Sequence, residues 1–533
     1  MLFTSYGFIA FVAILLVAYY LFPKKYLNYQ WTPLLAASYF FYAFSGIENF
    51  IFIIATTLSC FFVAKVIEKK KEREDEYVAL HKDDMDKESR KAYRAKEKKK
   101  RRVILALGLV FNFGILAVLK YTAFALKNVN SVISWFNADA TIAIPSLLLP
   151  LGLSFYVFQS TAYIIDVYRG KTYAEKNIAK LALFVSFFPQ LAQGPISRHS
   201  DLAKELYEPH RFSGKNLKFG LQRMLWGYFK KLVIADRILI AIKTMVGDTQ
   251  TYTGAYVFLL IILYSIEIYA DFTGGIDITI GLAEALGIKV TENFNRPFSS
   301  VSTKEYWNRW HITMGSWFTD YVFYPLSFSR PMMKLSTWSR AKLGNAVGKR
   351  LPVYIATSVT WFLTGLWHGA AWNFIVWGML NCLVILVSQE LEPLYRRFRE
   401  KFPRLTASYG YHCFEATRTF LLMGLIRSLD CYANVPLSFR MWGSMLTTFN
   451  YKGCFGGGIL DLGLEIKDYV IIALAVAVVA VVAKLSEKRD LREWLLGKTA
   501  LSWTLSAAIL LAIILFGAYS IGYDASQFIY TQF

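Results

Sequence analysis

Charged residues are scarce in this sequence, which argues against a soluble globular protein. Only 18% of its 533 residues are Asp, Glu, Lys or Arg, whereas 55% are hydrophobic and the mean hydropathy is +0.36. Soluble domains usually carry about 25% charged residues. The composition therefore predicts a protein that is surrounded by lipid.

Cysteine pairs and several common catalytic motifs are also missing. The five cysteines are scattered, form no CxxC pair, and mostly lie in apolar surroundings, where a free thiol behaves as a small hydrophobe. We therefore expect neither a disulfide framework nor a zinc or other metal site. The sequence has no glycine-rich phosphate loop, nucleophile elbow or HExxH motif, so soluble nucleotide and protease chemistries lose their usual support.

Acidic residues are outnumbered by basic ones, 38 to 59, which gives a formal net charge of +21. An excess of this size can indicate a nucleic-acid partner. In a membrane protein it more often reflects basic cytoplasmic loops and contact with anionic lipid. We expect membrane lipid as a partner and no nucleic acid.

Long apolar runs are abundant from one end of the sequence to the other. With their flanks, these runs are long enough to cross about 30 Å of hydrocarbon as helices. Examples are Phe8–Phe22, Phe50–Ala64, Val103–Leu119, Val353–Leu366, Tyr469–Ala483 and Leu505–Ile521. The expected fold is an all-α polytopic membrane protein with about 10–12 transmembrane helices and some re-entrant segments.

Two regions of the sequence differ from the apolar runs: one is rich in charged residues, and the other contains Gly and Pro residues that interrupt helices. Glu68–Arg102 mixes basic and acidic residues at helical spacings, which predicts a solvated cytoplasmic helical loop. Because three predicted helices precede this loop, the N-terminus is expected on the extracytoplasmic side. Between residues 189 and 351, Gly, Pro and polar residues interrupt the apolar runs. Irregular backbone at membrane depth is tolerated where protein buries it or where it lines a cavity, so we expect the functional site there.

One histidine stands inside an otherwise uncharged apolar segment. Trp361–Trp377 contains no Asp, Glu, Lys or Arg and places His368 between two apolar runs. A titratable side chain at that depth is costly and usually marks a function, although a neighbouring helix can also satisfy a lone histidine. Histidine suits acyl transfer, because its ordinary pKa near 6.5 lets it take a proton from a hydroxyl and return it to a leaving thiolate.

A second segment combines aromatic residues with Arg, Asn, His and Asp. It begins at Glu292, contains His311 and continues to Tyr321. On composition alone this pattern is also typical of a segment at a membrane interface. Gln159 and Asp271 are embedded polar residues, and Asp271 has three possible roles: a cap, a group that orients a histidine, or the lining of a polar channel. The alternative for each is a satisfied interhelical hydrogen bond.

Together these motifs resemble the membrane-bound O-acyltransferase (MBOAT) family, most closely the bacterial branch typified by the alginate O-acetyltransferase membrane subunit. The similarity spans roughly residues 140 to 390. The matching segments are Pro150–Phe155, Asp166–Gly170, Phe188–Ile196, Lys230–Asp236, Tyr269–Gly274, Glu292–Pro297, Tyr306–Ile312 and Thr364–Gly369.

The resemblance implies a helical bundle around a tunnel, with His368 as the catalytic base and His311 as the second functional residue. Other residues are expected to line or support the tunnel. They are Gln159, Asp271, Asn293, Asn295, Arg309, Trp310 and Trp367. The predicted organisation is N-terminal helices at 1–67, the charged loop at 68–102, the catalytic core at 103–390 and C-terminal helices at 391–533.

The resemblance also implies the substrates and the location. The donor is expected to be a cytoplasmic thioester, acetyl-CoA, with no permanently bound cofactor. The acceptor hydroxyl is expected to arrive from the outer side of the bacterial cytoplasmic membrane. An extracytoplasmic SGNH-type acyltransferase is the expected partner, and a surface polysaccharide is the expected final acceptor.

Two alternatives remain open at this stage. A D-alanyl transferase of the teichoic-acid pathway shares the histidine motifs but takes its donor from a carrier protein. The C-terminal helices at Tyr469–Ala483 and Leu505–Ile521 favour the acetyltransferase branch over it. A polysaccharide export or transport scaffold without chemistry is the alternative from another class, with Asp271, Glu267 and His311 lining its substrate path.

Overall fold

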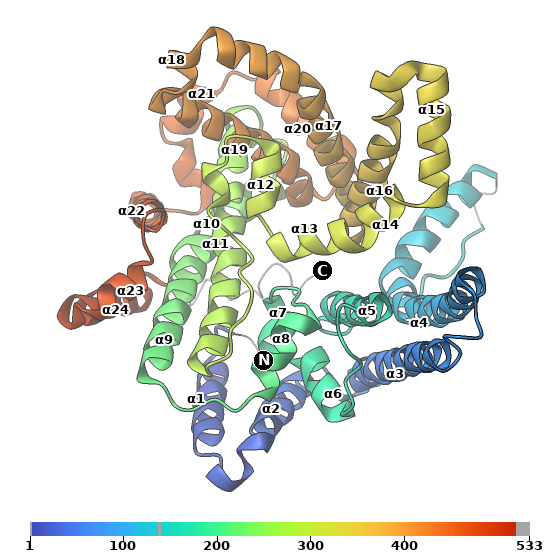
Figure 1. Ribbon diagram of the computed structural model, residues 1–533. Coiled ribbons are helices and arrows are strands. Elements are labelled where there is room, and N and C mark those ends of the chain that lie inside the picture. Colours follow the sequence, from blue (N-terminus) through green and yellow to red (C-terminus); the bar gives the residue numbers. More distant parts are fainter. Residues whose placement is uncertain (1–2, 137–139, 519–533) are drawn as a thin grey trace. The chain divides into compact units, whose positions relative to one another are not determined.

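The protein is all-helical over the part that the structure describes. The computed structural model describes residues 3–136 and 140–518, and within these ranges it contains helices and no strand (Figure 1). The predicted all-α class is confirmed. The chain divides into two compact units, Met1–Gly220 with Leu282–Val290, and Leu221–Gly281 with Thr291–Phe533. The predicted four-segment organisation stays a prediction.

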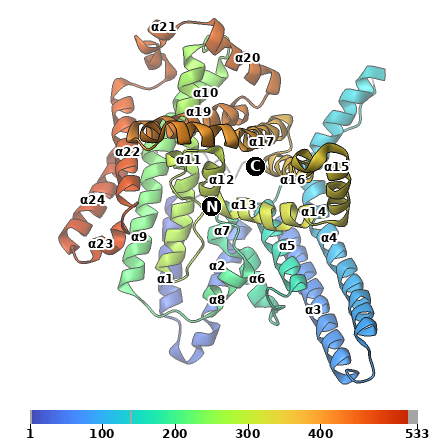
Figure 2. The same cartoon turned by 45° about the horizontal axis from the view of Figure 1, so that its top comes forward.

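The first unit is dominated by a long helical hairpin, in which α3 and α4 lie side by side (Figure 2). Buried Arg101 and Glu74 form an ion pair of 2.6 Å across the hairpin. The helical character predicted for Glu68–Arg102 is confirmed; its cytoplasmic position stays a prediction. The unit's helices are α1 (Tyr6–Tyr20), α2 (Trp31–Ala43), α3 (Phe50–Leu80), α4 (Lys87–Phe136), α5 (Leu153–Arg169), α6 (Ile178–Ser186), α7 (Phe188–Gln193), α8 (His199–Tyr207) and the start of α9 (Gly214–Tyr228).

The second unit contains most of the irregular backbone that the sequence predicts between residues 189 and 351. Two π-helical stretches, η3 (Phe229–Ala235) and η5 (Thr319–Phe323), interrupt its helices. The α-helices up to α17 are α10 (Asp236–Gly247), α11 (Ala255–Ala285), α12 (Thr303–Arg309), α13 (Ile312–Phe318), α14 (Tyr324–Ser327), α15 (Arg330–Gly348), α16 (Leu351–His368) and α17 (Trp372–Lys401). Those that follow are α18 (Pro403–Thr406), α19 (Tyr409–Tyr432), α20 (Val435–Thr447), α21 (Tyr451–Phe455), α22 (Ile466–Leu485), α23 (Leu491–Leu496) and α24 (Thr499–Phe516).

Six helices in the described part of the chain are long and apolar enough to cross a membrane. They are α3 with the turn before it, α4, α11, α17, α22 and α24. The predicted apolar run Val353–Leu366 lies within α16, and Leu505–Ile521 begins in α24, although its residues 519–521 lie outside the described range. A multi-pass membrane protein is confirmed. The predicted total of 10–12 spans and the tunnel stay predictions.

Glycines let α16 and α17 cross closely. A Cβ atom added to Gly378 would lie under 3.0 Å from the carbonyl oxygen of Trp361, and one added to Gly365 would meet the carbonyl of Phe374 equally closely. Small residues at such a crossing allow the two backbones to approach and gain van der Waals contact. This crossing therefore fixes the C-terminal end of α16, where His368 lies, against the start of α17.

Replacing Gly378 with Ala should destabilise the protein, because its methyl group has no room against the Trp361 carbonyl. We expect a loss of about 1–3 kcal/mol, the usual cost of overpacking, seen as a lower melting temperature of the purified protein in detergent. Gly410→Ala is the matched control, since no atom lies within 4 Å of a Cβ added to this α19 residue. Equal melting temperatures for the two variants would contradict the close crossing.

Candidate active site

His368 is the last residue of α16, directly after the buried Trp367. Its ring meets the edges of two tryptophans, with centroid distances of 5.0 Å to Trp367 and 4.7 Å to Trp377 of α17. The following residue, Gly369, has no space for a side chain, since a Cβ there would overlap the ring of Phe374. His368 as a whole residue is half-buried, and its Nε2 atom is buried within the aromatic wall that positions the imidazole.

His311 lies next to the same tryptophan. Its ring centroid is 6.0 Å from that of Trp367, and it meets the edge of Phe272 at 4.9 Å. The two histidines therefore flank Trp367 although they are far apart in the sequence. Their convergence, which the motifs alone could not supply, comes from the packing of α13 against the end of α16.

The backbone of His311 is held in an uncommon conformation. It precedes α13 with φ 49° and ψ 53°, in the left-handed region that few residues other than glycine occupy. The side chain is fully buried. Strained backbone of this kind persists only where the surroundings enforce it, and it concentrates at functional sites.

Asn293 determines how His311 is protonated. The Asn293 Oδ1 atom accepts hydrogen bonds from the backbone N–H of Thr313 (3.1 Å) and from the Thr313 hydroxyl (2.9 Å). A backbone N–H can only donate, so the amide oxygen must face this way. His311 Nδ1 lies 3.2 Å from the same oxygen and must therefore carry the proton that it shares with it. In the neutral ring, Nε2 is then the nitrogen with the lone pair.

A buried cation, the guanidinium of Arg427, lies close to this site. Arg427 of α19 is buried, and its guanidinium lies 4.5 Å from the ring centroid of Trp310, the residue before His311. Burial lowers the pKa of His311 well below its ordinary value, and the positive charge of Arg427 lowers it further. His311 is therefore neutral at physiological pH, the form that accepts a hydrogen bond or a proton at Nε2.

The remaining predicted residues fall into three settings. Buried Asp271 is an ion-pair partner of Lys231, with 2.6 Å between carboxylate and ammonium. Arg309 and Asn295 lie toward the surface, where Arg309 pairs with Glu305 and the exposed Asn295 accepts a hydrogen bond from the neighbouring Arg296.

Gln159 belongs to the first structural unit. Its side-chain amide donates to the Phe184 carbonyl oxygen at 3.1 Å, and the residue is buried. This is the satisfied interhelical hydrogen bond that the sequence left as its alternative.

Three residues that sequence reasoning missed contribute to the site: Thr313, Trp377 and Arg427. The sequence could have indicated Arg427, because this charged residue stands between the apolar stretches of α19 and such residues usually face the protein interior. No sequence feature indicated Thr313 or Trp377, since neither stands out from its neighbours. Among residues 3–136 and 140–518, no three His, Cys, Asp or Glu side chains gather where they could share a metal ion.

Known proteins share this chain's sequence pattern. A sequence profile of the membrane-bound O-acyltransferase family matches residues 175–338, a range that includes Asn293 and His311. The chain is 30% identical over 453 residues to the "Probable alginate O-acetylase AlgI" of Azotobacter vinelandii, covering 84% of this chain and 78% of that protein.

Two further relatives act on other polymers according to their names. The "Peptidoglycan O-acetyltransferase" of Helicobacter pylori is 29% identical, over 73% of this chain and 68% of its own length. The "Teichoic acid D-alanyltransferase" of Bacillus subtilis is 27% identical, over 48% of this chain and 62% of its own length. The similarity to acetyltransferases therefore extends over more of the chain than the similarity to this D-alanyltransferase.

The protonation of His311 can be observed directly by nitrogen NMR of protein labelled with ¹⁵N-histidine. We expect a neutral ring with the proton on Nδ1 that does not titrate between about pH 5 and 8, because the ring is buried beside a cation. The spectrum of His311→Gln assigns the signal. A proton on Nε2 would show that Asn293 does not set the tautomer, and a titration midpoint near the ordinary pKa of about 6.5 would show that burial and Arg427 do not keep the ring neutral.

Proposed function

Because this chain belongs to the membrane-bound O-acyltransferase family, we propose that it uses acetyl-CoA from the cytoplasm to supply acetyl groups for O-acetylation of a cell-surface polysaccharide. The family expected from the motifs is confirmed, and so is the activity class, an O-acyltransferase. The observation that supports a reaction centre at the histidines is their arrangement, in which His368 and His311 flank Trp367.

His368 is the better placed of the two histidines to act as the general base. As a whole residue it is half-buried, whereas His311 is fully buried, but its Nε2 atom is covered, so we expect the acceptor to reach it after a local movement of the surrounding aromatic side chains. It also stands at the C-terminal end of α16, where the free carbonyl groups of the helix favour a positive charge. That charge forms when the imidazole takes up a proton.

In the acyl transfer, His368 takes up one proton and gives it back. His368 takes the proton of the acceptor hydroxyl as its oxygen attacks the carbonyl carbon of the thioester. The tetrahedral intermediate collapses, the carbon–sulfur bond breaks, and an ester has formed. The leaving thiolate receives the proton from His368, so the free thiol departs and the histidine returns to its neutral state.

His311 assists this step as a fixed hydrogen-bond acceptor. Its Nδ1–H is held by Asn293, so the Nε2 lone pair has one direction. Such an acceptor orients a hydroxyl group or a protonated partner, and correct orientation alone contributes several orders of magnitude in rate. His311 is thus a positioning residue, and its neutrality keeps it from repelling the imidazolium that forms at His368.

The wider setting follows from the relatives' names and from charge. The alginate and peptidoglycan relatives support a polysaccharide acceptor. We place the protein in the bacterial cytoplasmic membrane with its N-terminus outside, since the basic Glu68–Arg102 segment favours the cytoplasm. An extracytoplasmic SGNH-type acyltransferase completes the transfer to the polymer, because a membrane-embedded site reaches a partner protein or small carrier more readily than a long glycan.

The donor and the base are tested together with purified protein and radiolabelled acetyl-CoA. We expect wild-type protein with its acceptor partner to transfer label, and His368→Gln to be slower by about 10²–10⁴-fold, the usual contribution of a general base. His412→Gln is the matched control, since His412 is an exposed histidine on α19. Melting temperatures of all three proteins establish that the variants are folded.

Two outcomes would contradict this function. Transfer from a D-alanyl-charged carrier protein but not from acetyl-CoA would identify a D-alanyl transferase instead. Full acylation of the surface polymer by folded His368→Gln would remove the base assignment and favour a scaffold without chemistry.

The coupling between Asn293 and His311 predicts non-additive mutant effects. His311→Ala and Asn293→Leu should each lower kcat by about 10²-fold, because each abolishes the same orientation of the imidazole. The double variant should be no slower than His311→Ala alone, since residues that act as one unit show strong interaction energies. Multiplied effects in the double variant would show that the two residues act independently.

A further inference from the structure

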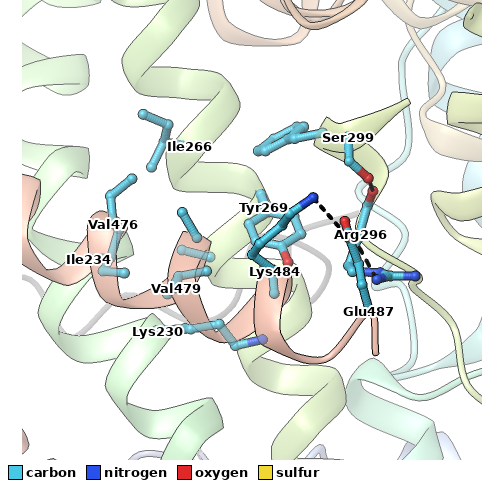
Figure 3. A pocket seen from close by; sticks show the side chains of 14 residues that line it. Lys230, Ile234, Ile266, Tyr269, Arg296, Ser299, Val476, Val479, Lys484 and Glu487 are labelled. Carbon is cyan, nitrogen blue, oxygen red and sulfur yellow. Dashed lines mark hydrogen bonds and ion pairs between the residues drawn. The ribbon is translucent and has the colours of Figure 1, made fainter. Parts of the chain in front are cut away.

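A cleft opens in the second unit beside α22 (Figure 3). Its volume is about 290 Å³, and it lies between α22, the elements α11 and η3, and the loop after Arg296. Most of its wall is apolar. The apolar residues are Ile234, Ile266, Ala270, Phe298, Val476, Val479, Ala480 and Ala483.

One end of the cleft is ionic. Figure 3 shows Arg296, Lys484 and Glu487 meeting there, opposite the end where Val476 and Ile234 lie. Lys484 pairs with Glu487 at 2.8 Å, whereas the Arg296 Nη1 atom is 3.8 Å from the same carboxylate. This Nη1 atom is buried and makes no hydrogen bond to any described residue. At this end the positive side chains of Arg296 and Lys484 share the single carboxylate of Glu487, and Arg296 Nη1 can still donate a hydrogen bond to a ligand.

The ionic end lies at the end of a helix that is long and apolar enough to span a bilayer. Lys484 is in the last turn of this helix, α22. The short connection from there to α24 carries Lys488, Arg489, Arg492 and Lys498 against three acidic residues. Basic short loops favour the cytoplasmic side, where the leaflet is rich in anionic lipid.

Aromatic side chains separate the cleft from the reaction centre. Tyr269 and Phe298 line it and contact each other at 4.8 Å, and both rings lie 6.3 Å from buried Trp310 on their other side. Neither His311 nor His368 is among the lining residues. A molecule in this cleft would therefore not contact either histidine.

We propose that this cleft binds an anionic phospholipid from the cytoplasmic leaflet. One acyl chain lies along the apolar wall between α22 and α11, and the phosphate of the headgroup accepts hydrogen bonds from Arg296 and Lys484. The apolar length and the cationic mouth complement the two parts of such a lipid. A soluble phosphate would leave the apolar wall empty, and a zwitterionic lipid such as phosphatidylcholine would bring its choline cation close to the positive side chains of Arg296 and Lys484.

The test is native mass spectrometry of the full-length protein, delipidated in detergent and titrated with phosphatidylglycerol or phosphatidylcholine. We expect tighter binding of phosphatidylglycerol. The Arg296→Gln/Lys484→Gln variant should lose about fivefold in affinity per charge removed, so that its preference for the anionic lipid disappears.

A matched pair of neighbouring residues tests the acyl chain site. Val479 lines the cleft, whereas Val478 faces away from it and is 45% exposed. Val479→Trp should abolish retention of phosphatidylglycerol, and Val478→Trp should leave it unchanged. If Val479→Trp fails to fold, the lipid preference of the Arg296→Gln/Lys484→Gln variant still tests the proposal.

Three results would overturn the proposal. These are equal affinity of wild-type protein for the two lipids, equal retention by the two tryptophan variants, or displacement of bound phosphatidylglycerol by coenzyme A. The last result would mean that the cleft belongs to the thioester donor.

Discussion

The position and protonation of His311 depend on one oxygen atom, the Oδ1 of Asn293. Three donors converge on it, two from Thr313 and one from the His311 ring. Inside a protein surrounded by lipid, no water competes for these bonds, and a donor left alone would cost several kcal/mol. This shared acceptor therefore does more than hold the loop. It also selects which ring nitrogen keeps its proton.

Other polar residues of the interior form buried ion pairs. Lys231 lies 2.6 Å from Asp271 and 2.8 Å from Asp236, so two carboxylates share one ammonium at the π-helical stretch η3. Such pairs are expensive to break once buried, so they preserve the irregular backbone. The setting of His368 is different, because its ring packs against the side chains of Trp367 and Trp377.

Much of this could be predicted from the sequence, for identifiable reasons. The helical class follows from apolar runs that only helices can carry across lipid, and His368 was conspicuous because nothing charged stands near it in Trp361–Trp377. The resemblance to a family supplied His311. Hydropathy could not supply the pairing of Asp271 with Lys231 or the place of Arg427 behind Trp310, because both depend on which helix faces meet. The tautomer of His311 needed the direction of one backbone N–H, which no residue pattern encodes.

The left-handed backbone at His311 has an evolutionary consequence. Side chains that tolerate this conformation are chiefly Gly, Asn, Asp and His, so the fold narrows the choice of residue before chemistry does. Of these, Gly offers no side chain and Asp would bring a charge into a fully buried place. Asn and His remain as the neutral hydrogen-bonding substitutes. The backbone conformation therefore limits which residues can replace His311 during evolution. In a related protein that lacks this histidine, asparagine is the expected substitute.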